Sequence, residues 1–180
     1  MPLTFDGIVY RAHNPRWSWS PLSGEGAKRF GGRFNPVGTP ALYTSLKAST
    51  ALLEASPLGR PFQPLTLVSY RVRATVFDAT EAPALAALGF AEADLAHATW
   101  EMDMARGVPP PQHRLAAALI EQGLDGVRVR SFARGATAGD LNIVFWRWDR
   151  TGAEITVIDD EGRLPQDGSS WPDRPTPKDR

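Results

Sequence analysis

The sequence predicts an α+β fold in a single domain, and three observations predict it. The chain has 180 residues, a length that fits one domain with a core of its own. Its predicted strands and helices are mixed, without the regular strand-helix alternation of a doubly wound sheet. It has no cysteine, so neither disulfides nor a cysteine-ligated metal can replace that core.

The first predicted element is a short strand over residues 7–12, where β-forming residues alternate and which ends on Tyr10 and Arg11. Residues 13–40 contain many Gly, Pro, Ser and Trp residues and show no period. A loop of this length inside a compact domain is usually functional or disordered. Its aromatic residues argue against simple disorder, so we expect a functional loop.

A brief strand over residues 41–45 leads into a helix predicted over residues 47–59, with Ser45 or Ser49 as the expected cap. Its alanines and leucine fall on one stripe. At 100° per residue, Glu54 lies about 110° from the centre of that stripe. We therefore expect Glu54 on the flank of this helix and not beneath it.

The second half of the chain continues the mixed pattern. Strands are predicted over residues 65–80, 125–132, 141–148 and 154–159, and helices over residues 83–106, broken near Gly89, and 113–123 with Gly123 at its end. From residue 159 onward, turn formers and charges replace apolar residues. The domain is therefore predicted over residues 1–158 and a flexible tail over 159–180.

The charge composition excludes some function classes. The formal net charge is zero, which argues against a broad surface for nucleic acid. Only three cations are lysines, and arginine suits bidentate capture of phosphate or carboxylate, although a GC-rich genome would produce the same bias. The sequence has no cysteine, no leader pattern and no long apolar run. We therefore expect a cytoplasmic protein that does not enter a membrane.

Common catalytic motifs are absent from the sequence. It has no dinucleotide-binding glycine motif, phosphate-binding lysine loop, zinc-protease helix or serine-hydrolase elbow. The three histidines lie in unrelated contexts, so we expect neither a metal site nor a Ser-His-Asp triad.

A set of polar residues remains at predicted strand ends and in loops. Taken singly, each has a structural explanation: Arg11 as a surface cation, Tyr43 as a core aromatic, Glu54 as a solvated helix residue. A stripe of Arg128, Arg130 and Arg134 would suit nucleic acid, but the chain is neutral as a whole and interleaved aromatic residues are missing. The full candidate set is Arg11, Arg33, Asn35, Tyr43, Glu54, Ser131 and Asn142.

The order and spacing of these residues are more specific than any one of them. A strand ending in Tyr-Arg precedes "GGRFNPVGTPALYTSLKASTALLE" (31–54), and a later strand ends in Ser131. Over residues 7–150, this pattern resembles the RES domain, which is named for its Arg, Glu and Ser. On that resemblance, Arg11, Glu54 and Ser131 are the name-giving residues.

The resemblance implies both fold and function. RES proteins are similar in fold to ADP-ribosyltransferase toxins such as diphtheria toxin, with mixed, mostly antiparallel sheets and flanking helices. They are toxins of type II toxin-antitoxin pairs that act on NAD+. The expected partners are an Xre-like helix-turn-helix antitoxin that neutralises the active site and a host protein that accepts ADP-ribose. No membrane and no direct nucleic acid contact are expected, since DNA is reached through the antitoxin.

The resemblance also assigns roles to the candidate residues. Glu54 would stabilise the positive charge that develops on ribose as the nicotinamide bond breaks. Arg11 and Arg33 would clamp the NAD+ pyrophosphate, and Tyr43 would stack on nicotinamide. Ser131 would hydrogen-bond the cofactor, with Asn35 and Asn142 as further cofactor-binding residues. No metal is expected.

Three functions remain open at this point. Transfer of ADP-ribose to a host protein is the first, and breakdown of NAD+ by hydrolysis or phosphorolysis is the second. Leu52 stands where arginine-specific transferases have an acidic or amide residue, so arginine is not the expected acceptor. The third is a non-catalytic module that binds a phosphorylated ligand or RNA.

Overall fold

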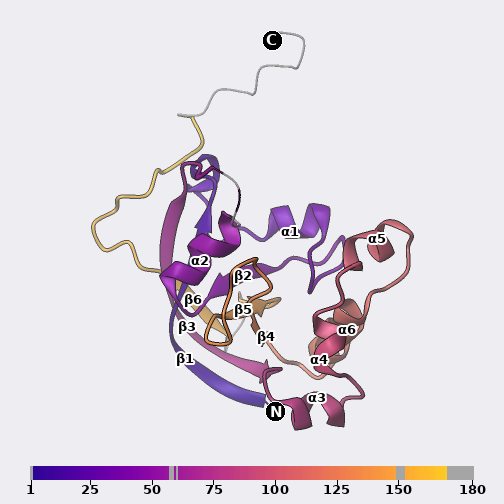
Figure 1. Cartoon of the computed structure of the whole chain (residues 1–180). Coiled ribbons are helices and arrows are strands. Elements are labelled where there is room, and N and C mark those ends of the chain that lie inside the picture. Colours follow the sequence, from indigo (N-terminus) through magenta and orange to yellow (C-terminus); the bar gives the residue numbers. More distant parts are fainter. Residues whose placement is uncertain (1, 57–58, 60, 149–152, 170–180) are drawn as a thin grey trace, which may run out of the picture.

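The computed structural model describes residues 2–56, 59, 61–148 and 153–169 (Figure 1). One six-stranded sheet has the order β1-β2-β5-β4-β3-β6. The strands are β1 (Pro2–His13), β2 (Leu42–Ser45), β3 (Thr66–Asp78), β4 (Gly126–Arg130), β5 (Leu141–Phe145) and β6 (Glu154–Val157). β3 and β4 run parallel, and the other described strand pairs are antiparallel. Because β1 also pairs with β3, strands β1, β2, β5, β4 and β3 form a closed ring of paired strands.

Helices flank this sheet. They are the 3-10 helix η1 (Pro15–Trp17), α1 (Glu25–Phe30), α2 (Ala48–Ala55), α3 (Ala82–Ala87), α4 (Glu92–Leu95), α5 (Trp100–Ala105) and α6 (Pro111–Glu121). Figure 1 shows α3–α6 gathered at one side of the strands, with α2 at a distance from that group. The predicted α+β single domain with a mostly antiparallel sheet is confirmed. Within the described residues, no helix combines the length and apolar character needed to cross a membrane.

Two apolar clusters hold the elements together. The first packs α6 on the sheet: Leu115 and Leu119, four residues apart on one face, are both fully buried with Val127 of β4. The second contains alternate residues of β3, such as Tyr70 and Val72, together with residues of β1, β2, β5 and β6. Each fully buried large apolar side chain contributes roughly 1.5–3 kcal/mol. Both faces of the sheet are therefore fixed by burial.

The predicted loop over residues 13–40 contains two short helices that the sequence did not reveal. α1 ends where Gly31 takes a positive φ of 73° and its amide bonds the carbonyl of Ala27. Asn35 Nδ2 donates to the same carbonyl at 2.9 Å. A tertiary contact thus stabilises a six-residue helix with no periodic apolar stripe. β1 is longer than predicted because its whole length pairs with β3.

Two further local predictions were wrong. Residues 83–106 form three short helices and not two pieces: Gly89, with φ of 79°, follows the first, and a second break separates α4 from α5. Neither expected serine caps α2, because Lys47 is the cap residue and its side chain makes no capping bond. Ser45 instead belongs to β2.

The predicted tail is described in part. In residues 159–169, the carboxylate of Asp159 accepts the amides of Arg163 at 2.7 Å and Leu164 at 3.1 Å, and Leu164 packs against the second apolar cluster. Residues 170–180 lie outside the described residues. The boundary between domain and tail stays a prediction.

Candidate active site

A pocket of about 270 Å³ lies where β1, β2 and β5 meet α2. This volume is near the lower end of small-molecule sites. Four predicted site residues line it: Arg11, Tyr43, Glu54 and Asn142. They come from four different elements, so only the folded chain brings them together. Ser45 also lines the pocket and was not predicted.

Glu54 is the carboxylate of this pocket. It lies in the last turn of α2, exposed on the flank of the helix as expected. Its Oε1 accepts hydrogen bonds from Ser131 Oγ at 2.6 Å and from Asn142 Nδ2 at 2.5 Å. These two hydrogen bonds fix the side chain beside the pocket.

The Asn142 amide has a defined orientation. Its Oδ1 accepts a hydrogen bond from Ser45 Oγ at 2.7 Å, so Nδ2 faces Glu54. Ser45 pairs with Asn142 across β2 and β5 and is buried. The sequence held one signal for Ser45: Tyr43 and Ser45, two residues apart on a strand, point to the same face. Its contact with Asn142 depends on register and was not foreseeable.

Ser131 lies just after β4 and contacts Glu54 directly. Its hydroxyl donates to Glu54 and accepts the amide of Ala133 at 3.2 Å. Among the described contacts, the acceptor of the Ser131 proton is the Glu54 carboxylate. This geometry makes Ser131 a hydrogen-bond partner of that carboxylate.

Arg11 places a half-buried cation at the pocket. Its Nη1 donates to the carbonyls of Pro21 and Ser23, both at 3.1 Å, which ties the segment before α1 to β1. Burial lowers the pKa of Arg11, an effect that interaction with Tyr70 opposes. Tyr70 Oη donates to the same Pro21 carbonyl at 2.8 Å. Arginine keeps its charge in such surroundings.

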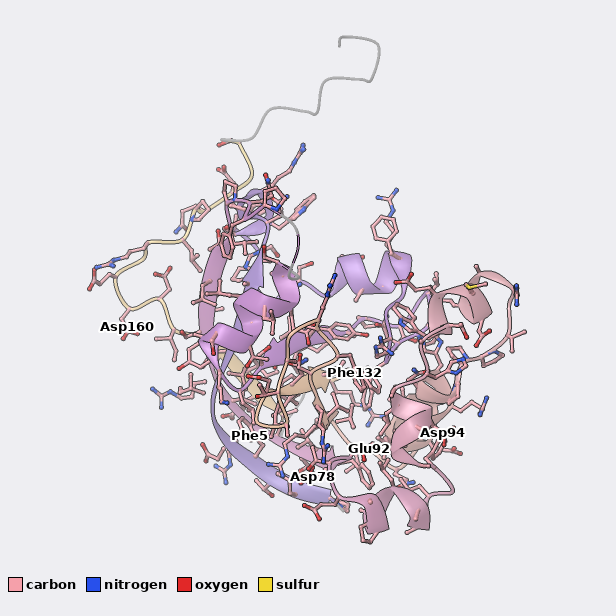
Figure 2. All side chains as sticks on the ribbon, viewed as in Figure 1. Phe5, Asp78, Glu92, Asp94, Phe132 and Asp160 are labelled. Atoms are coloured by element: carbon pink, nitrogen blue, oxygen red, sulfur yellow. The ribbon has the colours of Figure 1, made fainter. Side chains whose placement is uncertain are left out.

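Arg33 is not among the residues that line the pocket. Its Nη1 donates to the carbonyl of His97 at 3.2 Å, in the connection between α4 and α5. Its guanidinium lies 4.5 Å from the ring centre of Phe132, labelled in Figure 2, and 5.5 Å from that of Trp100. Burial lowers the pKa of Arg33, and the negative charge of Glu54 opposes that shift. Arg33 therefore joins the glycine-rich loop to the helical side of the molecule.

Tyr43 and Asn35 shape that loop from inside. Tyr43 Oη donates to Asn35 Oδ1 at 2.7 Å and accepts the amide of Phe34 at 3.0 Å. Burial raises the pKa of Tyr43, which keeps the hydroxyl protonated. Asn35 is fully buried and its amide donates to the carbonyls of Ala27 and Thr39, both at 2.9 Å. The structure places this predicted cofactor-binding residue in the loop's interior, without surface facing the pocket.

Gly32 leaves space for this arrangement. A Cβ atom there would lie 2.5 Å from Tyr43 Oη and 2.7 Å from Asn35 Oδ1. The carbonyl of Gly32 also accepts a hydrogen bond from His113 Nε2 of α6 at 2.8 Å. The loop thus needs glycine at position 32 for close approach.

Among the described residues, no group of three or more His, Asp or Glu side chains is arranged to hold a metal ion. The polar groups of the pocket are one carboxylate, one amide, hydroxyls and a guanidinium. The guanidinium and hydroxyls suit an anionic or polar organic ligand. The carboxylate suits a ligand atom on which positive charge develops.

Fold and pocket together define an α+β protein with a carboxylate-arginine site on a strongly curved sheet. The RES domain model matches residues 8–167. The chain belongs to the RES-domain family.

The similar proteins include a curated toxin and a chain of a solved toxin-antitoxin complex. The "Toxin Res" protein of Photorhabdus laumondii is 43% identical over 47 residues, a stretch that covers 26% of this chain and 30% of that protein. The match thus spans less than a third of the relative's length. The crystal structure of the M. tuberculosis MbcT-MbcA toxin-antitoxin complex contains a chain with a TM-score of 0.55 and 22% identity. That likeness covers 86% of this chain and 84% of the other, and it shows a shared fold.

Proposed function

We propose that this chain is the toxin of a type II toxin-antitoxin pair and that it consumes NAD+ in the cytoplasm. Membership of the RES family supports the proposal, as do the relative named as a toxin and the structural neighbour solved in a toxin-antitoxin complex. The observation that carries the chemistry is the Glu54 carboxylate, held by Ser131 and Asn142 at a pocket that Arg11 also lines.

The proposed reaction breaks the bond between nicotinamide and ribose. The nicotinamide nitrogen takes the bonding electron pair and leaves as a neutral molecule, while positive charge develops at ribose C1′. The negative carboxylate of Glu54 stabilises that charge. Two donors, Ser131 and Asn142, hold its Oε1 in place. Arg11 provides the cation for the pyrophosphate. Arg33 as a phosphate ligand stays a prediction, since it is not among the residues that line the pocket.

The acceptor of ADP-ribose decides the reaction class. We propose transfer to a side chain of a host protein, which bonds to C1′ and releases a proton. The second candidate is water or phosphate as acceptor. It is favoured by Leu52, a half-buried apolar residue two positions before Glu54, because a small nucleophile needs no docking group there.

Labelled NAD+ tests these alternatives directly. Purified chain would be incubated with NAD+ labelled in the ADP-ribose portion, with and without cell lysate, and the products read by mass spectrometry. Protein-bound ADP-ribose supports transfer, while free ADP-ribose or its 1″-phosphate supports hydrolysis or phosphorolysis. Intact NAD+ in every arm would overturn the enzyme proposal and favour a module that only binds ligand.

A toxin requires a partner that silences it in the producing cell. We propose a helix-turn-helix antitoxin that covers the pocket and the segment 13–40. Hydrogen exchange on this chain, alone and with the product of the adjacent gene, would test the proposed antitoxin-binding surface. Protection of residues 13–40 is expected, and protection confined to α3–α6 would contradict the proposed surface.

A further inference from the structure

Asp140 contacts both parts of the chain that form the Glu54–Ser131 hydrogen bond. Asp140 immediately precedes β5, and its side chain is 15% exposed. Oδ1 accepts a hydrogen bond from Thr50 Oγ1 of α2 at 2.7 Å. Oδ2 accepts the amide of Thr137 at 2.8 Å and its hydroxyl at 2.7 Å. The Asp140 carbonyl accepts the amide of Ser131 at 2.7 Å. One residue therefore ties α2 to the connection that carries Ser131.

The contacts between α2 and the start of β5 occur at two matched points. Thr50 and Glu54 lie about one helical turn apart, a rise of about 6 Å. Asp140 and Asn142 are two positions apart at the start of β5, a rise of about 6.7 Å in extended chain. Thr50 bonds Asp140 and Glu54 bonds Asn142. A helix held at one point can pivot, whereas two points fix the direction of the Glu54 side chain.

The contacts at Asp140 suit a carboxylate. The groups that face its two oxygens all act as donors: the Thr50 hydroxyl, the Thr137 amide and the Thr137 hydroxyl. The ammonium of Lys47 lies 3.8 Å from Oδ1. The bond from Thr50, followed by those from Thr137, holds the pKa of Asp140 well below its usual range. An asparagine would remove the charge beside Lys47 and turn its N–H group toward the Thr50 hydroxyl, which would then accept a hydrogen bond where it now donates one.

We propose that Asp140 is a positioning residue for the NAD+ reaction. It keeps Glu54 and Ser131 at hydrogen-bond distance by joining their two elements, and it acts without touching the substrate. This inference rests on the NAD+-consuming function proposed above.

Kinetics of matched variants test the proposal. Asp140→Asn and Thr50→Val are each expected to lower kcat by about 10- to 100-fold, because displacement of a catalytic group is severe even at ångström scale. KM for NAD+ should change less than about two-fold, since the pocket itself is retained. Thr50→Ser, which keeps the hydroxyl, should restore activity. Asp159→Asn, in the turn after β6, is the control and should leave kcat unchanged. Unchanged kcat in both Asp140→Asn and Thr50→Val would overturn the proposal.

A double-mutant cycle separates positioning from a general structural effect. In a Ser131→Ala background, Asp140→Asn should lower kcat less than about three-fold, because the bond it positions is already gone. An equal loss in both backgrounds would overturn the proposal.

Hydrogen exchange provides a readout that does not depend on activity. Asp140→Asn should speed exchange in residues 48–55 and 131–140, and unchanged exchange would overturn the proposal. If the wild-type chain leaves NAD+ intact, the enzyme function fails, and this exchange result alone decides whether Asp140 joins the two elements.

Discussion

The amide of Asn142 donates to the carboxylate of Glu54 across 2.5 Å, and Ser45 sets the direction of that bond by donating to the other end of the amide. Ser45 of β2 and Asn142 of β5 thus fix one carboxylate oxygen of Glu54 in α2. Since the same oxygen also accepts the Ser131 hydroxyl, the carboxylate is oriented before any ligand binds. Preorganisation of this kind favours stabilisation of a charge that develops later.

Asn142→Asp tests this directed bond by replacing a donor with a second carboxyl group. Two carboxyl groups at hydrogen-bond distance share a proton, because both cannot be ionised without strong repulsion. We expect the acidic limb of the kcat/KM profile for NAD+ to move upward by about one pH unit or more. Asn142→Ala, which adds no charge, should shift the limb less. Identical acidic limbs for wild type and Asn142→Asp would contradict the bond.

Gly32→Ala tests the close packing under the glycine-rich loop. The new methyl group would clash with Tyr43 Oη and Asn35 Oδ1, so the free energy of unfolding should fall by about 1–3 kcal/mol. The matched control is Gly26→Ala in α1, where a Cβ meets no heavy atom within 4 Å. That change should be neutral or stabilise by up to about 1 kcal/mol. Urea unfolding measures both, and equal effects would contradict the packing.

His13 predicts a loss of stability in mild acid. Its Nε2 is buried and has no hydrogen-bond partner among the described residues. Burial lowers the pKa of His13 to about 4, and the charge of Arg11 acts in the same direction. The unfolded chain, with a histidine pKa of about 6.5, binds the proton first. Stability should therefore fall as the pH drops from about 6.5 to about 4.

His13→Leu isolates this effect because leucine does not titrate. Urea unfolding at several pH values should show a flatter pH dependence for the variant than for the wild type. Parallel curves over that pH window would exclude His13 as the cause.

The sequence predicted the fold class and most strands because local patterns encode them. It also predicted that Arg11, Tyr43, Glu54 and Asn142 belong to one site, and they line the same pocket. That prediction came from their order in the chain together with the family resemblance. The α1 helix was missed because a tertiary hydrogen bond from Asn35 supports it, not a local period.

Local sequence patterns could not predict the contacts between residues that are distant in the chain. Ser45 reaches Asn142, 97 residues later, only through strand register, and Thr50 reaches Asp140, 90 residues later, only in the folded chain. Arg33 contacts the ring of Phe132 and backbone carbonyls, and it is not among the residues that line the pocket. Its role as a phosphate ligand stays a prediction.

Nicotinamide release from NAD+ by purified wild type and by Glu54→Gln tests the proposed chemistry most directly. Glutamine keeps the size of the side chain and removes its negative charge, so matched circular dichroism would verify folding. The wild type should release nicotinamide, and the variant should be slower by about 100-fold or more, the size expected when a preorganised charge is lost. Equal release by both proteins, or no release by the wild type, would contradict the role of Glu54.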